Sequence, residues 1–148
     1  MDIKTLNLLN EVNRAIIQIR GIYSRWSAEY NISYNEMLVL YTIRENGYCT
    51  QKQICDSYLL PRQTINNVIT GMRKNGILEP DKAHTSGREK AFRLSKYGEE
   101  YAKPLIEAMN EFEEKAVYII GTDKLKTLTK LMTEYDSALI NAFDREGE

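Results

Sequence analysis

Helix start and stop signals recur at short intervals in the middle of this 148-residue chain. A hydroxyl residue followed three positions later by Glu or Gln matches the capping box of a helix start. Proline suits a first helical turn, and Asn-Gly matches a helix end. In chain order the signals are Ser33 with Glu36, Asn46-Gly47, Thr50 with Gln53, Pro61, and Asn75-Gly76. This spacing predicts three short helices and excludes one long helix in this part of the chain.

A long helix is expected before this region, and two further helices after it. From Ile3 to Tyr30 the apolar residues keep a spacing of three or four, which predicts one helix too long for the core of a small domain. Ser95 can cap a helix that Gly121-Thr122-Asp123 interrupts, and a last helix is expected from about Lys124 to Phe143. The apolar stripe of this last helix consists of Leu128, Leu131, Tyr135 and Leu139.

Short strands are expected between the central helices and Ser95. Ile77 to Glu79 and Glu89 to Leu94 favour strands, whereas Pro80 to Gly87 is rich in turn-forming residues and predicts a loop. The tip of the resulting β-hairpin is polar and cationic, with Lys82, His84, Thr85, Ser86, Gly87 and Arg88. Such a tip suits a wing that lies along a DNA backbone or inserts an arginine into a minor groove.

The helix predicted from Pro61 to Lys74 has two chemically different faces. Apolar residues at i, i+3, i+4 and i+7 form the face that must be buried, namely Ile65, Val68, Ile69 and Met72. Amides, hydroxyls and cations form the opposite face and its flanks, namely Arg62, Gln63, Asn66, Asn67, Thr70, Arg73 and Lys74. Amides can pair with adenine edges and cations suit guanine or phosphate, so this acid-free face is typical of a helix that reads a duplex. For an isolated helix, a merely solvated polar face is the commoner explanation.

Charge is segregated along the chain, although the net charge is only −1. Between Cys49 and Gly98 nine Lys or Arg stand against four Asp or Glu, a net charge of +5, and the remaining residues carry −6. A basic middle between acidic ends is expected if the centre meets phosphates. The charge pattern therefore favours DNA contact over simple solvation for the polar helix face.

Other features bound the class of protein. Length and apolar content fit one soluble domain. The sequence has no run of about 18 apolar residues, so no membrane span is expected. No secretion signal is evident, so we expect a cytoplasmic protein without membrane contact. Cys49 and Cys55 lie six positions apart, which argues against a local disulfide and favours small buried side chains.

The sequence offers little for catalysis. His84 is the only histidine, and it lies in the cationic hairpin loop without an evident nucleophile beside it, so a solvent or phosphate contact is its simplest role. There is no glycine-rich phosphate loop, no CxxC pair and no pair of histidines at metal-ligand spacing. We therefore expect no enzyme, no catalytic residue, no metal site and no cofactor.

Three closely spaced helices followed by a basic hairpin match the winged helix-turn-helix, and particular residues resemble the MarR family of transcriptional regulators. The match is carried by Leu60 to Asn67, Asn75 to Leu78, Gly87-Arg88, and Leu94 to Gly98. The resemblance covers essentially the whole chain. It implies a mainly α-helical fold with a small β-hairpin wing. In this fold residues 33–98 form the winged helix-turn-helix DNA-binding lobe, and residues 1–32 and 99–148 form the flanking dimerisation helices.

The resemblance also implies a homodimer that places two recognition helices in successive major grooves of a pseudo-palindromic operator, most simply as a repressor. Carried over by position, the residues expected to read the major groove are Arg62, Gln63, Thr64, Asn66 and Asn67, with Thr70 on the same face. Phosphate contacts are expected from Lys74, Lys82 and Lys90, and a wing-tip contact from Arg88. Ser86 stands where the family usually has an acidic residue, a departure that bears on the shape of the wing.

In this family, small aromatic or phenolic effectors often sit between the dimerisation helices and the DNA-binding lobe. The aromatic residues expected to converge there are Tyr23, Trp26, Tyr30, Tyr34 and Tyr41. The resemblance thus implies a ligand-responsive regulator, although an aromatic stripe at helical spacing more often packs in a core.

A winged-helix protein-interaction module without sequence-specific DNA binding is the alternative function. Fold alone does not fix function, and such a module should expose large apolar anchors on the outward helix face. That face instead carries Gln63, Asn67, Thr70 and Lys74, which favours DNA.

Overall fold

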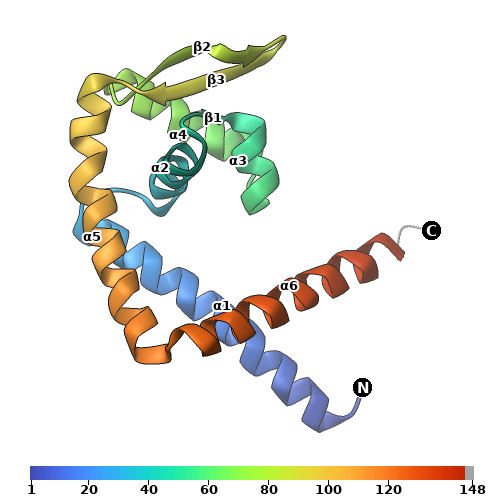
Figure 1. The fold of residues 1–148 in the computed structure, drawn as a ribbon. Coiled ribbons are helices and arrows are strands. Elements are labelled where there is room, and N and C mark those ends of the chain that lie inside the picture. The colour runs from blue at the N-terminus through green and yellow to red at the C-terminus, as the bar shows by residue number, and fades with distance from the viewer. Residues whose placement is uncertain (146–148) are drawn as a thin grey trace. The chain divides into compact units, whose positions relative to one another are not determined.

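The computed structural model describes residues 1–145, which form six α-helices and a three-stranded β-sheet (Figure 1). The helices are α1 (Ile3–Glu29), α2 (Tyr34–Asn46), α3 (Gln51–Tyr58), α4 (Arg62–Lys74), α5 (Lys96–Ile120) and α6 (Thr122–Arg145). The strands are β1 (Cys49–Thr50), β2 (Leu78–Ser86) and β3 (Glu89–Leu94). The chain divides within α5 into two compact units: the first covers residues 1–105, and the second begins at Ile106.

Both predicted capping boxes are formed. Ser33 Oγ accepts a hydrogen bond from the backbone N–H of Glu36 at 3.1 Å, and Glu36 Oε2 accepts one from the backbone N–H of Ser33 at 2.8 Å. Thr50 and Gln53 repeat this exchange at the start of α3. Each box satisfies donors that a helix start leaves unpaired, so these two residue pairs fix where α2 and α3 begin.

Helix ends fall close to where the sequence predicts them. Gly47 and Gly76 have φ angles of 81° and 74°, in the left-handed region that glycine adopts without strain. The helix predicted from Ile3 to Tyr30 is confirmed to within one residue, and Asn31 follows it with a φ of 55°. Pro61 lies in extended backbone directly before α4, so this helix begins one residue later than expected.

The three strands form one antiparallel sheet in the order β1-β3-β2. The short strand β1, which pairs with β3, was not predicted from the sequence. The predicted loop from Pro80 to Gly87 is wrong, because β2 continues to Ser86 and only Gly87 and Arg88 form the turn. Proline is tolerated here because β2 is an edge strand, where some N–H groups have no partner strand to bond.

The core of the first unit lies where α2, α3 and α4 pack on one another. Its largest fully buried side chains include Met37, Leu40, Ile54, Ile65 and Met72. On α4, Ile65, Ile69 and Met72 are buried as predicted, whereas Val68 is only half-buried. Burying one side chain of this size contributes roughly 1.5–3 kcal/mol. The buried stripe therefore decides which face of α4 turns outward.

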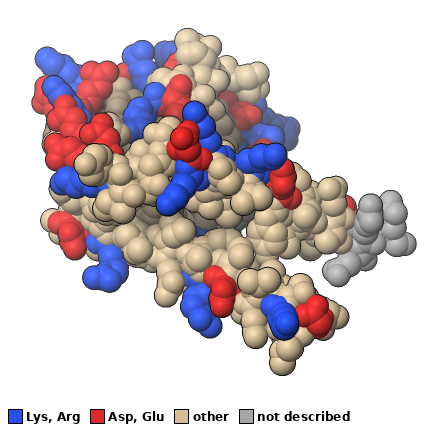
Figure 2. Space-filling model, turned by 60° about the horizontal axis from the view of Figure 1, so that its bottom comes forward, with Lys and Arg blue, Asp and Glu red and all other residues tan. Residues whose placement is uncertain are grey.

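Large apolar side chains remain exposed on the long helices. On α1 they include Ile3, Leu8, Ile17, Ile19 and Ile22, and on α6 they include Leu128, Leu131 and Leu139 of the predicted stripe. Figure 2 shows wide areas of one face of the molecule that carry no Lys, Arg, Asp or Glu. Within residues 1–145, no helix is both long and apolar enough to cross a membrane. Exposed apolar surface of this kind marks a site of association with another molecule.

The start of α5 packs tightly on the segment that follows α4. The backbone N–H of Ser95 donates to the Ile77 carbonyl at 3.0 Å, and Ser95 Oγ accepts from the backbone N–H of Gly98 at 2.9 Å, which confirms the predicted helix cap. A Cβ atom at Gly98 would lie 2.0 Å from the Ile77 carbonyl oxygen. Only glycine therefore fits at this position.

Gly98→Ala should lower the free energy of unfolding by about 2 kcal/mol or more, because its methyl group would meet backbone that cannot move aside. Gly71→Ala is the matched control. Gly71 lies in α4 with open space where a Cβ would be, so alanine should stabilise the protein by about 0.5–1 kcal/mol. Urea denaturation measures both effects, and equal stabilities of the two variants would contradict the close approach at Gly98.

Candidate nucleic-acid interface

α4 presents the predicted polar face to solvent. The exposed residues are Arg62, Gln63, Asn66, Asn67, Thr70, Arg73 and Lys74, and Thr64 is half-buried. Gln63 Nε2 donates a hydrogen bond to Asn67 Oδ1 at 2.9 Å, one helical turn further on. This contact leaves Gln63 Oε1 as an acceptor and Asn67 Nδ2 as a donor. A donor and an acceptor side by side are the complement of an adenine edge in the major groove.

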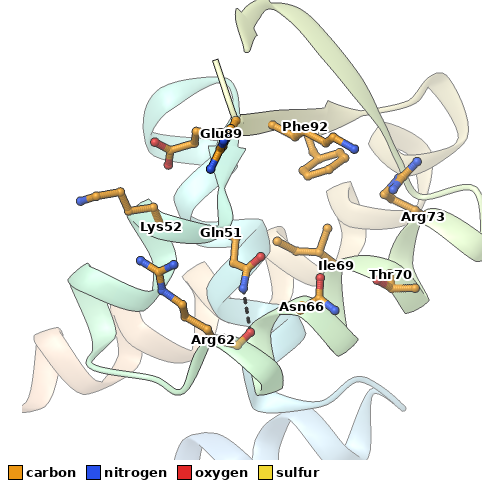
Figure 3. Close-up of a pocket in the computed structure, with 11 residues that line it drawn as sticks. Gln51, Lys52, Arg62, Asn66, Ile69, Thr70, Arg73, Glu89 and Phe92 are labelled. Atoms are coloured by element: carbon orange, nitrogen blue, oxygen red, sulfur yellow. Dashed lines mark hydrogen bonds between the residues drawn. The ribbon is translucent and has the colours of Figure 1, made fainter. Parts of the chain in front are cut away.

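α3 holds the beginning of α4 in place. Gln51 Nε2 donates a hydrogen bond to the backbone carbonyl of Arg62 at 2.8 Å, marked by the dashed line in Figure 3. Gln51 lies in the first turn of α3, and Arg62 is the first residue of α4. The two helices of the helix-turn-helix are thus joined at the end of α4 where most of the predicted base-reading residues lie.

A groove of about 360 Å³ runs between α3, α4 and the β2–β3 hairpin (Figure 3). Five of the residues that line it are cations, namely Lys52, Arg62, Arg73, Arg88 and Lys90. Glu89 is the one acidic residue among the described residues that line this groove. A concave surface with this excess of positive charge attracts a polyanion such as a nucleic-acid backbone.

The Glu89 carboxylate has partners within the protein. Thr50 Oγ1 donates a hydrogen bond to Glu89 Oε1, and Thr50 is also the residue that caps α3. The hydrogen bond from Lys52 to Asp56 is the largest cause of a raised pKa at Lys52, and the negative charge of Glu89 adds to it. Lys52 therefore stays positively charged beside the groove.

Arg73 belongs to this surface, although the DNA contacts chosen from the sequence left it out. Its guanidinium carbon lies 5.1 Å from the centroid of the Phe92 ring, within cation–π distance. Arg73 lines both the groove and a second hollow of about 340 Å³, which Lys82 and Lys90 share. The helical period of the sequence already places Arg73 on the flank of the polar face of α4. The ring that holds Arg73 comes from β3, and no local pattern predicts that contact.

The hairpin exposes its predicted cations. Lys82, Arg88 and Lys90 are all exposed, and Gly87 permits the tight turn before Arg88 with a φ of 56°. Ser86 pairs with Glu89 across this turn. Arg88 therefore lies at the end of a two-stranded ribbon and lines the groove beside α4.

The five aromatic residues predicted to line an effector pocket lie on α1, at its C-terminal end, or on α2. Tyr23 and Tyr34 have ring centroids 6.1 Å apart and line a hollow of about 200 Å³. Its other lining residues are Ile16, Ile19, Arg20, Leu38, Tyr58 and Leu60. Trp26 and Tyr30 stack on each other with centroids 4.3 Å apart, and Tyr41 lies against an arginine of its own helix. Only Tyr23 and Tyr34 of the five line this hollow.

Both cysteines are buried, as predicted, and neither forms a disulfide. Burial raises the pKa of the Cys49 thiol to about 12, and burial also raises the pKa of Cys55. The thiolate is the form that reacts with oxidants and binds metals, so a raised pKa lowers the reactivity of these thiols. The two side chains serve packing.

A family model described as the MarR family matches residues 30–88, which contain α2, α3, α4 and β2. The solved structure of NMB1585, a MarR family regulator from Neisseria meningitidis, is similar over 95% of this chain and 99% of its own. The two sequences are 27% identical, and the TM-score is 0.79. The chain therefore resembles MarR family regulators, both in the match of residues 30–88 to the family model and in its fold. A search of curated proteins found no match.

Two other MarR family structures share the fold at lower identity. A MarR family regulator from Listeria monocytogenes, complexed with a 26mer DNA, is 19% identical, with a TM-score of 0.71 over 90% of this chain and 89% of its own. The MarR protein of Staphylococcus aureus, in complex with salicylate and kanamycin, is 18% identical, with a TM-score of 0.70 over 93% of this chain and 96% of its own. The winged helix fold predicted for this chain is thereby confirmed.

Proposed function

We propose that this protein is a sequence-specific transcriptional regulator of the MarR family that binds double-stranded DNA as a homodimer and acts as a ligand-responsive repressor. The observation that carries the proposal is the exposed, acid-free polar face of α4, opposite a buried apolar face. A helix of this kind fits a major groove and offers groups that bases and phosphates can bind. The Listeria regulator complexed with DNA has the same fold, which supports the proposal.

The side chains divide into base-reading and backbone-binding groups. In this proposal, the residues that read the major groove are Arg62, Gln63, Thr64, Asn66, Asn67 and Thr70. Lys74, Lys82 and Lys90 bind phosphates, and Arg88 at the wing tip reaches a flanking minor groove. Arg73 joins the phosphate-binding group because Phe92 holds its guanidinium beside the same groove.

A homodimer accounts for the apolar side chains that α1 and α6 leave exposed. Homodimers and repressors are typical of the family. We propose that residues 1–32 and 99–148 form the dimerisation region and residues 33–98 the DNA-binding lobe. Two lobes related by a two-fold axis would bind half-sites about 10 base pairs apart, so the operator should be an inverted repeat.

An effector site is proposed at the hollow beside Tyr23 and Tyr34. Two aromatic rings and the nearby Arg20 offer stacking and a cation for the carboxylate of a small aromatic or phenolic acid. The Staphylococcus aureus protein in complex with salicylate supports this class of ligand. The other three aromatic residues predicted for the pocket do not line this hollow, namely Trp26, Tyr30 and Tyr41.

A protein-interaction module is the second candidate function. It would need large apolar anchors on the outward face of α4, which carries amides, a hydroxyl and cations instead. The structure therefore gives less support to this function than to DNA binding.

Selection of genomic DNA fragments by the purified protein tests the proposed function. At near-physiological salt and with random duplex as competitor, we expect an enriched inverted repeat with half-sites about 10 base pairs apart. Transcription from a promoter that contains the repeat should fall when the protein is added. If no sequence is enriched over random DNA, with and without salicylate, the regulator proposal fails and the protein-interaction module takes its place.

Single substitutions should separate base reading from phosphate binding. Arg62→Ala or Gln63→Ala should relax base preference at one position, because each removes a group that faces base edges. Lys82→Ala should weaken operator and random DNA alike and lower the salt slope by roughly one ion. Affinities measured at several salt concentrations test this, with the exposed Lys126→Ala on α6 as a control expected to change neither quantity. Equal losses on random DNA for the first three variants would refute the division.

Salicylate should raise the thermal unfolding temperature of the protein if the hollow binds aromatic acids, because a ligand that binds only the folded state stabilises it. Tyr34→Leu should abolish this rise, whereas Tyr118→Leu, on a side chain that is 90% exposed, should leave it unchanged. A panel of aromatic acids that leaves the unfolding temperature of the wild-type protein unchanged would count against the effector site.

A further inference from the structure

β2 carries an irregular segment close to the tip of the hairpin. Asp81 pairs with Ala91 and Ser86 pairs with Glu89, so the residues from Lys82 to Thr85 stand opposite a single residue of β3. A bulge of this kind bends a strand and interrupts its ladder of hydrogen bonds. The outer end of the hairpin therefore depends on other contacts to hold it in one position.

Asp81 organises this bulge. Its buried carboxylate accepts hydrogen bonds from the backbone N–H groups of Ala83 and His84, at 3.0 and 3.2 Å, and lies 2.9 Å from His84 Nδ1. The hydrogen bond from His84 is the largest cause of a lowered pKa at Asp81, so the carboxylate is ionised and can only accept. The His84 Nδ1 atom therefore carries the proton of this contact.

The same imidazole lies flat on the ring of Tyr48. The two ring centroids are 4.0 Å apart, and the ring planes are inclined by 7°. Tyr48 belongs to the segment between α2 and β1, so the stack joins the bulge to the helical part of the lobe. The His84 side chain is 49% exposed, which distinguishes it from a residue that fills the core. The sequence predicted only a solvent or phosphate contact for His84, and its contacts with Asp81 and Tyr48 were not predicted.

A second contact holds the other strand of the hairpin. Thr50 Oγ1 donates to Glu89, the residue that follows the turn. Tyr48 and Thr50 are close in the chain, and each is joined to a different strand of the hairpin: Tyr48 to β2 and Thr50 to β3. Arg88 lies in the turn between the two attached strands.

We propose that His84 is a positioning residue for the wing: held between Asp81 and Tyr48, it fixes the hairpin tip and Arg88 relative to α4. This inference rests on the proposed DNA-binding function and adds a residue that touches neither bases nor phosphates. A wing that is ordered before binding loses less conformational freedom on the duplex. More of the interaction energy of Arg88 then appears as affinity for the operator.

Three substitutions test the contribution of the stack to DNA binding. His84→Ala removes both contacts, Tyr48→Leu removes the stack alone, and Tyr48→Phe keeps an aromatic ring as the matched control. We expect the first two to weaken binding to the selected operator about tenfold, and the control to leave it unchanged within about twofold. Equal affinities of His84→Ala, Tyr48→Leu and the wild type would overturn the proposal.

The stack can also be observed in the protein without DNA. Because His84 is the only histidine, one imidazole Cε1–Hε1 signal in the nuclear magnetic resonance spectrum reports its surroundings. The ring current of Tyr48 should shift this signal upfield, Tyr48→Phe should preserve the shift, and Tyr48→Leu should remove it. A wild-type signal at the position of an unstructured histidine would overturn the proposal independently of any DNA measurement.

Arg88→Ala separates positioning of the wing from a general loss of structure. If His84 acts through the tip, His84→Ala should weaken binding far less in the Arg88→Ala background than in the wild-type background. An equal loss in both backgrounds would assign His84 a general structural role and overturn the proposal. A wild-type protein that selects no DNA would overturn this inference and the proposed function together. A selective wild type with unaffected His84 and Tyr48 variants would overturn this inference alone.

Discussion

Burial of one apolar stripe of α4 is the constraint on which the rest of the structure depends. Ile65, Ile69 and Met72 are removed from water where α4 packs on α2 and α3, at roughly 1.5–3 kcal/mol for each side chain. Rotating α4 about its axis would expose this stripe to water. Burying the amides and cations of the opposite face in its place would not compensate for that loss. Core packing therefore presents the polar face outward, and the hydrogen bond from Gln51 fixes the end of α4 at which the face begins. The candidate interface needs no strained backbone on α4.

Most of the helical framework could be predicted from the sequence, because its signals are local. The boxes at Ser33 and Thr50 and the left-handed glycine at Gly47 each act within a few residues of the helix end that they define. β1 was missed because two residues are too few for an alternating pattern, and its pairing is decided by a strand some 40 residues away in the chain. The turn-forming residues of β2 predict a loop, but the same residue types also suit a strand with a bulge.

Exposure of the candidate DNA contacts was predictable for the same reason, since one helical period places Gln63 and Asn67 opposite Ile65. The contacts that hold other side chains of the candidate site in place could not be predicted from a local sequence pattern. Arg73 is held by Phe92 on β3 and His84 by Tyr48 beside β1, and both pairs depend on how the sheet is registered against the helices. The sequence thus indicated which side chains could meet a ligand, whereas tertiary packing decides which of them are held in one position.

The close approach at Gly98 couples two helices mechanically. The backbone of the first turn of α5 rests on the carbonyl of Ile77 with no side chain between them, and Ser95 is hydrogen-bonded to Gly76, Ile77 and Gly98. A helix that begins in this way cannot slide or roll without moving the chain that leaves α4. A rotation of the first turn of α5 would therefore displace the end of α4 through these backbone contacts and would not be absorbed by a flexible loop.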